Sequence, residues 1–149
     1  MKTLIVYDSA YGNTEKVARA IGDAVMGEVE VLRVGEVNSS ELKIYDLLIF
    51  GSPTQGGKPT RVISDFLSQI TAPIFQSVKL AAFDTRLSKK WVGIFGNAAS
   101  GIANRLKANG LTLIVPPEGF FVKGTKGELE NGEVEHAAMW AKVIIDKIK

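Results

Sequence analysis

Many hydrophobic residues in this chain form short continuous runs, and polar residues bound each run. Runs of this kind, too short for a helix and bounded by polar residues, are typical of strands buried on both faces of a sheet. Residues 30–34 alternate instead, which predicts a strand nearer the sheet edge. Pro116 and Pro117 interrupt the last run, and Phe120–Val122 is expected to resume it at the edge. The nearly continuous runs are 4–7, 46–52, 78–83 and 111–115.

Between these runs, apolar residues recur at spacings of three and four, which is typical of helices with one buried face. Pro59 is predicted in the first turn of its helix, a position that tolerates proline. Asn38 begins a cluster of capping residues, which predicts one short helical turn. The predicted longer helices follow Thr14, Pro59, Asn97 and Gly132.

Strands that alternate with helices predict a parallel sheet covered by helices on both faces. With right-handed crossovers, the expected fold class is α/β: a doubly wound five-stranded parallel sheet of order 2-1-3-4-5 in a three-layer α/β/α domain. Residues 1–149 are expected to form this single domain, because no linker, repeat or low-complexity segment divides them. Ligands of such folds bind at the carboxyl ends of the strands.

The loop after the first strand has the chemistry of an anion site. It consists of Ser9, Ala10, Tyr11, Gly12, Asn13 and Thr14 and leads into a helix. Unpaired N–H groups and the helix dipole favour an anion at a helix N-terminus. The two hydroxyls and the amide add donors, so the loop predicts a phosphomonoester bound without lysine or metal. A plain capped turn is the alternative reading.

Two stretches carry a family resemblance. The segment Ser9-Ala10-Tyr11-Gly12-Asn13-Thr14-Glu15 resembles the FMN-phosphate loop of flavodoxins, except that Tyr11 stands where many members have Thr. The segment Gly51-Ser52-Pro53-Thr54-Gln55-Gly56-Gly57 resembles the flavodoxin loop that flanks the isoalloxazine ring. The resemblance implies a flavodoxin-like fold, FMN as cofactor and an electron-carrier function.

The resemblance also implies roles for residues of the second loop. A peptide at this place in flavodoxins turns its carbonyl toward flavin N5 when the flavin is reduced, a role that falls on Gly56. Gly56 and Gly57 suit such a loop because glycine adopts positive φ at little cost. Gln55 stands where many flavodoxins stack an aromatic ring, which leaves that face of the ring open. Pro53 and Thr54 complete the expected contacts, while a simple flexible turn is the alternative.

A third stretch, Asp84, Thr85, Arg86 and Leu87, is expected to follow the fourth strand and to lie against the pyrimidine edge of the flavin. Trp91 is the expected aromatic wall, with a packing anchor as the equal alternative. An Arg86 guanidinium near flavin N1 would stabilise the anion of the reduced flavin. The alternative for Arg86 is an ion pair with Asp84 or Glu118, away from the ring.

Composition narrows the chemistry. There is no cysteine and one histidine, His136, which excludes thiolate catalysis and disfavours multi-histidine metal sites. His136 is expected to be a solvated helix residue. No apolar run approaches the ~20 residues of a membrane span, so we expect a cytoplasmic protein with no membrane contact. No nucleic-acid-binding module is recognisable.

Charge is unevenly distributed. The net charge is only +2, but residues 47–117 hold eight basic and two acidic side chains. This excess predicts a redox partner protein with an acidic docking surface, although a merely solvated basic face would look the same. The oligomeric state is left open.

Two further functions compete with the electron carrier. An FMN-dependent NAD(P)H or quinone oxidoreductase is the main alternative, which the open ring face at Gln55 would suit. The chain has no dinucleotide motif or spare acid–base group to favour it. A phospho-acceptor receiver domain shares the topology but needs Asp where the third strand ends in Ser52.

Overall fold

The computed structural model describes residues 1–88 and 96–149. Its strands lie in one five-stranded sheet of order β2-β1-β3-β4-β5, and every neighbouring pair is parallel. The predicted doubly wound order 2-1-3-4-5 is therefore confirmed. The elements in chain order are β1 Lys2–Tyr7, α1 Asn13–Ala24, β2 Glu28–Arg33, the 3₁₀ turns η1 Val34–Glu36 and η2 Ser39–Ile44, β3 Leu47–Pro53, α2 Arg61–Leu67, β4 Lys79–Leu87, α3 Ala98–Ala108, β5 Glu118–Val122 and α4 Glu133–Ile148.

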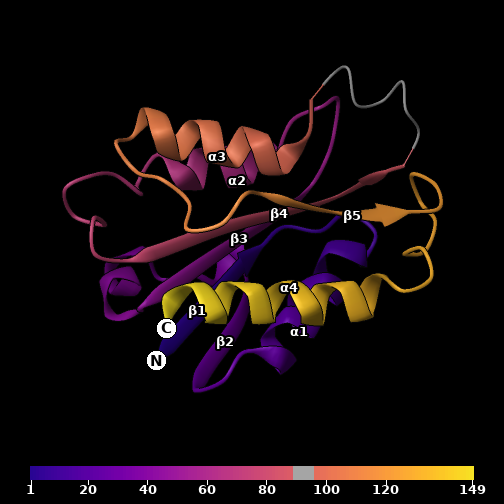
Figure 1. The fold of residues 1–149 in the computed structure, drawn as a ribbon. Helices are drawn as coiled ribbons and strands as arrows, with labels where there is room; N and C mark the ends of the chain where they lie inside the picture. Colours follow the sequence, from indigo (N-terminus) through magenta and orange to yellow (C-terminus); the bar gives the residue numbers. More distant parts are fainter. Residues whose placement is uncertain (89–95) are drawn as a thin grey trace.

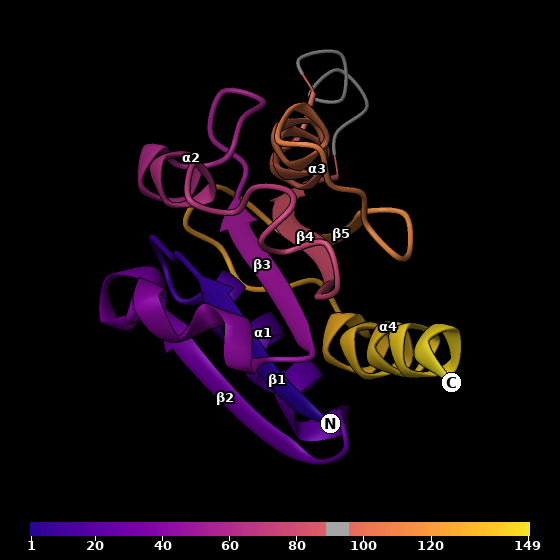
Figure 2. The same cartoon turned by 90° about the vertical axis from the view of Figure 1, so that its left-hand side faces the viewer.

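The helices cover the sheet on both faces: α1 and α4 pack on one face and α2 and α3 on the other (Figures 1 and 2). Alternate residues of the central strands feed the two cores, as the strand period requires. On β3, Leu48 and Phe50 face α2 and α3, whereas Leu47 and Ile49 face α1 and α4. Burial on both faces explains why these runs read as almost uninterrupted apolar sequence.

The last strand was predicted in two parts, and only the second is confirmed: Phe120–Val122 lies in β5 at the sheet edge, whereas Leu111–Val115 forms no strand. Leu111–Val115 contributes one recorded backbone hydrogen bond to β4, from Ile114 N–H to the Leu80 carbonyl, and is not a ladder strand. The ladder forms after the two prolines, where β5 pairs with Phe83–Leu87. Proline lacks the N–H that a ladder needs, so pairing resumes beyond the prolines.

The position of β5 also explains why the end of the fourth strand was predicted wrongly. The fourth strand was predicted to stop at Phe83, but β4 continues to Leu87. Because β5 pairs with its last five residues, Asp84–Leu87 is strand and not loop. The carboxyl end of the sheet is therefore extended on the side where the candidate site lies.

Two local predictions were also wrong. Pro59 lies outside the helix, since α2 begins at Arg61 and Thr60 is its N-cap, accepting a hydrogen bond from Ile63 N–H. His136 is not simply solvated: its ring contacts carboxylates of Glu118 and Glu133 at 3.1 and 3.2 Å and packs at a tilt of 48° against the ring of Phe120, with centroids 4.5 Å apart. The expected turn after Asn38 is present, with the Asn38 side chain accepting from Ser40 N–H.

Candidate functional site

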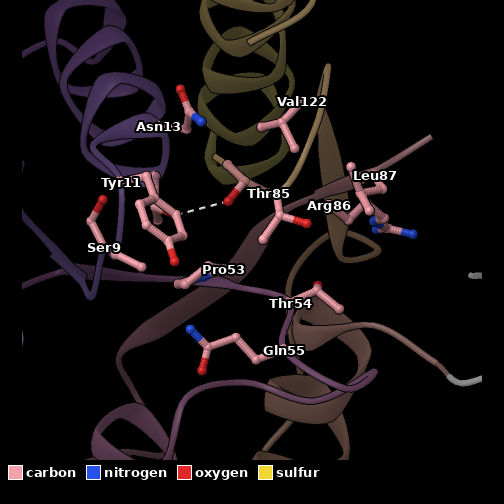
Figure 3. Close-up of a pocket in the computed structure, with 13 residues that line it drawn as sticks. Ser9, Tyr11, Asn13, Pro53, Thr54, Gln55, Thr85, Arg86, Leu87 and Val122 are labelled. Carbon is pink, nitrogen blue, oxygen red and sulfur yellow. Dashed lines mark hydrogen bonds between the residues drawn. The ribbon is translucent and has the colours of Figure 1, made fainter. Parts of the chain in front are cut away.

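Four chain segments meet in one pocket at the carboxyl ends of β1, β3, β4 and β5, with about 610 Å³ of open space that includes its mouth (Figure 3). Tyr11 stands on one side of the pocket, Arg86 and Leu87 on the other, and Pro53 between them. The pocket is lined by Ser9, Ala10, Tyr11, Asn13, Thr14, Pro53, Thr54, Gln55, Thr85, Arg86, Leu87, Val122 and Thr125.

Of the fifteen predicted site residues that lie in the described part of the chain, four do not line this pocket. Gly12, Gly56 and Gly57 belong to its loops, and the side chain of Asp84 is buried behind the pocket wall. The prediction for Trp91 falls on residues outside the described part of the chain. The other eleven line the pocket together.

The first loop is held by its own side chains. Asp8 Oδ1 accepts from Ser9 N–H, and the Ser9 hydroxyl oxygen accepts from Gly12 N–H, both at 3.0 Å. Gly12 has φ of +92°, a left-handed conformation that a glycine adopts without steric cost. Arg33 secures the same turn by donating to the Ser9 carbonyl at 3.0 Å.

The turn leaves donors free for a ligand. No hydrogen bond to the described part of the chain is recorded for the N–H groups of Ala10, Tyr11, Asn13 and Thr14. These groups lie where the loop enters α1, so the helix dipole adds to the attraction for an anion. Because the Ser9 oxygen only accepts in the turn, its O–H proton is also free to be donated.

The second loop is a tight bend with an adjustable tip. Gln55 and Lys58 pair through two backbone hydrogen bonds of 2.9 and 3.1 Å. Between them, Gly56 and Gly57 both have the positive φ expected of them, +58° and +79°. Thr54 N–H donates to the Thr85 carbonyl at 2.9 Å, which fastens the loop to β4.

Asp84 and Arg86 form an ion pair beside the pocket. The Arg86 Nε–H donates to Asp84 Oδ1 at 2.8 Å, and Ala99 N–H, in the first turn of α3, donates to Oδ2 at 2.9 Å. Asp84 is fully buried, and burial raises the pKa of its carboxyl, although Ala99 N–H and Arg86 oppose that rise. The pairing with Asp84 that the sequence left open is therefore present, while Arg86 also lines the pocket.

One wall of the pocket was missed by sequence reasoning. The loop after β5 folds over the first loop, where Asn13 Nδ2 donates to the Gly127 carbonyl and Lys126 lies over the Tyr11 ring, 5.9 Å from its centroid. Val122 and Thr125 line the pocket from this side. The only sequence feature that pointed to this wall is a polar, glycine-rich stretch at 124–132. Such a stretch is equally typical of an ordinary surface loop.

Two kinds of site find no support in the described residues. No group of three or more histidine, aspartate or glutamate side chains there is placed to hold a metal ion. In the same residues, no helix combines the length and the apolar composition that crossing a bilayer requires.

The fold and pocket define a class: doubly wound α/β proteins with a ligand pocket where the connections that follow the paired strands β1 and β3 leave to opposite faces of the sheet. Comparison with known proteins agrees. The flavodoxin family pattern matches residues 5–140. A flavodoxin of Maridesulfovibrio salexigens is 30% identical, with 99% of each chain covered.

Solved structures give the same result. Oxidised flavodoxin 2 from Bacillus cereus superposes with a TM-score of 0.80 at 26% identity over 99% of each chain. Rubredoxin oxygen:oxidoreductase from Desulfovibrio gigas shares the fold at 19% identity and a TM-score of 0.72, with 99% of this chain matching 37% of that one. This chain belongs to the flavodoxin family.

Members of this family bind FMN, and the site fits it. The unpaired N–H groups of the first loop and the hydroxyl of Ser9 suit the doubly charged phosphate of FMN, and Gly12 leaves open space where a side chain would begin. The pocket beyond that loop, between the second loop and the end of β4, provides room for a ring.

Proposed function

We propose that this flavodoxin carries electrons between redox partner proteins through non-covalently bound FMN. The observation that carries the proposal is the convergence of the first loop, the second loop and the end of β4 on one pocket. Bound FMN takes up and gives back electrons singly or in pairs, which the side chains of this protein cannot do for themselves. The chain's own task is to bind, orient and shield the cofactor.

The roles of the site residues follow from their positions. Ser9 to Thr14 hold the phosphate, with the loop over Asn13 closing one side. Pro53, Thr54 and Gln55 flank the ring, and Gly56 and Gly57 supply a peptide able to turn at its edge. Thr85, Arg86 and Leu87 meet the ring from β4, while Asp84 positions Arg86 and the start of α3.

The redox partner in this proposal has an acidic docking surface. Its support is the excess of eight basic over two acidic residues in 47–117, the part of the chain that includes the second loop and β4. Opposite charges on two proteins accelerate their encounter and orient it. A cytoplasmic location is part of the same proposal and rests only on the ordinary globular composition.

An FMN-dependent reductase acting on NAD(P)H or a quinone is not favoured. The Maridesulfovibrio salexigens relative, matched over 99% of its length, is a flavodoxin. The sequence also lacks a dinucleotide-binding motif.

The proposal is tested with purified protein reconstituted with FMN. A flavin absorption spectrum, FMN binding tighter than riboflavin binding, and stepwise reduction in a potentiometric titration are the expected results. NADPH and a quinone added without a reductase should give no steady turnover. Protein that stays colourless and quenches no FMN fluorescence would overturn the proposal, and sustained turnover would replace it with the reductase.

A further inference from the structure

A groove with three basic side chains runs between α2 and α3. Lys58, Arg61 and Arg105 all line it with exposed side chains, and Arg105 lies about one turn farther along α3 than Gly101. Its open space is about 1060 Å³. Figure 2 shows the two helices side by side on the sheet face away from α4.

The groove begins at the flavin loop. Lys58 is paired through its backbone with Gln55, and Gln55 lines the pocket on the other side of the same bend. A molecule seated in the groove therefore touches the bend that carries Gly56 and Gly57. The bend from Gln55 to Lys58 is therefore a wall that the groove and the flavin pocket have in common.

The floor of the groove is firmly built. A Cβ atom on Gly101 would lie only 2.7 Å from Pro59 Cδ, so α3 approaches Pro59 as closely as it does because residue 101 has no side chain. Thr60 caps α2 directly after this proline. The spacing between Arg61 and Arg105 is thus set by packed backbone and not by flexible loops.

The positive charge of the groove is scarcely compensated. Residues 47–117 contain two carboxylates, and one of them, Asp84, is buried in its pair with Arg86. The other, Asp65, lies 3.8 Å from Arg61 with both side chains largely exposed, an arrangement that contributes little. These two are the only acidic residues in the sequence from 47 to 117, so the eight basic residues of that range greatly outnumber them.

We propose that this groove is the docking site for the acidic surface of the redox partner. The inference rests on the proposed electron-carrier function and adds the place of contact. Carboxylates of the partner pair with Lys58, Arg61 and Arg105, which brings the partner's redox centre toward the bend at the flavin edge. One electron leaves that centre and enters the flavin, with no bond made or broken.

The test uses the FMN-loaded protein and two protein probes of opposite charge. A reduced acidic [2Fe–2S] ferredoxin donates electrons to it, and basic cytochrome c accepts them from its reduced form. Stopped-flow absorbance gives the second-order rate constants, measured from about 10 mM to about 500 mM ionic strength, where the Debye length falls from about 30 Å to a few ångströms. The groove variant carries Lys58→Gln, Arg61→Gln and Arg105→Gln.

A matched control variant removes the same charge elsewhere. Lys79 begins β4 at the other end of the sheet, and Lys142 and Lys147 lie on α4, across the sheet from the groove (Figure 1). All three are exposed. The control variant carries Lys79→Gln, Lys142→Gln and Lys147→Gln.

We expect the groove variant to react with ferredoxin at least about tenfold more slowly than wild type at low ionic strength, and to lose most of the salt dependence. The control variant should stay within about twofold of wild type, and the groove variant should react no more slowly with cytochrome c. If the two variants were slowed equally, the effect would come from net charge alone, and the proposed docking site would be wrong. Unchanged rates in the groove variant would overturn it as well.

Failure of the docking site and failure of the proposed function give different results. FMN affinity and reduction by the small, uncharged 5-deazaflavin radical should be the same in all three proteins. If wild type binds no FMN, the electron-carrier function itself is wrong. If all three bind FMN and react equally with ferredoxin, only the docking site is wrong.

Discussion

The hydroxyl oxygens of Thr14 and Thr85 lie 2.8 Å apart although 71 positions separate the two residues in the sequence (Figure 3). Both residues are buried, with exposed fractions of 1% and 5%. The hydrogen bond ties the first turn of α1 to β4, so it fixes the distance between the phosphate side and the ring side of the pocket. Breaking the bond would leave two buried hydroxyls without partners, which costs free energy. The two segments are therefore held together firmly.

Thr85→Val should therefore loosen the pocket and destabilise the protein. The change keeps the side-chain volume nearly constant but leaves the Thr14 hydroxyl buried without a partner, a loss of about 1–3 kcal/mol in unfolding free energy. FMN affinity should fall by roughly tenfold, which is about 1.4 kcal/mol. Urea unfolding of the apoprotein and FMN fluorescence titration measure the two effects. Thr85→Ser is the control that keeps the hydroxyl, and equal values for both variants would contradict the role of the link.

The sequence predicted the central strands and the first loop well because burial on both faces and a strand-to-helix turn leave strong local patterns. At the edge of the sheet, the sequence predicted Phe120–Val122 correctly and Leu111–Val115 wrongly. Leu111–Val115 is as apolar as a true strand, yet the ladder forms at Glu118–Val122, since pairing depends on which backbone groups β4 offers. The Thr14–Thr85 link and the Asp84–Arg86 pair are likewise tertiary contacts, which local pattern does not encode.

Substitution of Gly12 tests the phosphate loop, because its effect on backbone strain can be separated from its effect on FMN binding. Gly12 and Gly132 have nearly equal φ values of +92° and +86°, and a Cβ on either would meet no atom within 4 Å. Alanine at either position should therefore lower the unfolding free energy similarly, by roughly 1–2 kcal/mol. Only Gly12→Ala should weaken FMN binding, by about tenfold or more, with riboflavin affinity almost unchanged because riboflavin lacks the phosphate.

Isothermal titration calorimetry with FMN and with riboflavin checks this difference, with Gly132→Ala as the matched control. If Gly12→Ala weakened both flavins equally, the loop would be acting on the ring and not on the phosphate. If both alanine variants bound FMN alike, the conformation of Gly12 would have no part in binding.

The ion pair of Arg86 with Asp84 predicts two opposite shifts in the reduction potential of bound FMN. Removing the cation in Arg86→Gln should disfavour the anion of the reduced flavin and make its couple more negative. Removing the carboxylate in Asp84→Asn leaves the cation uncompensated and should make the couple less negative. Each shift is expected to be up to about 60 mV, a factor of ten in a one-electron equilibrium. Potentiometric titration of both holoproteins decides, and shifts of the same sign would show that the pair does not act through its charge.

The buried carboxyl of Asp84 also predicts how stability depends on pH. Burial is the largest influence on this group and raises its pKa above the usual 3.8, against the opposing hydrogen bond from Ala99 N–H and the charge of Arg86. Between 3.8 and the raised value, the folded protein holds more protons at Asp84 than the unfolded chain does. Its contribution to the unfolding free energy therefore falls as pH rises through that interval and is constant above it.

Asp84→Asn removes this titration while leaving every other ionisable side chain in place. The unfolding free energy of the variant minus that of wild type should thus increase from pH 3.8 upward and then level off. Urea unfolding of the two apoproteins at matched pH values gives this difference directly. A difference that decreased instead would mean that Arg86 and Ala99 stabilise the carboxylate by more than burial penalises it, because a lowered pKa reverses the sign of the slope.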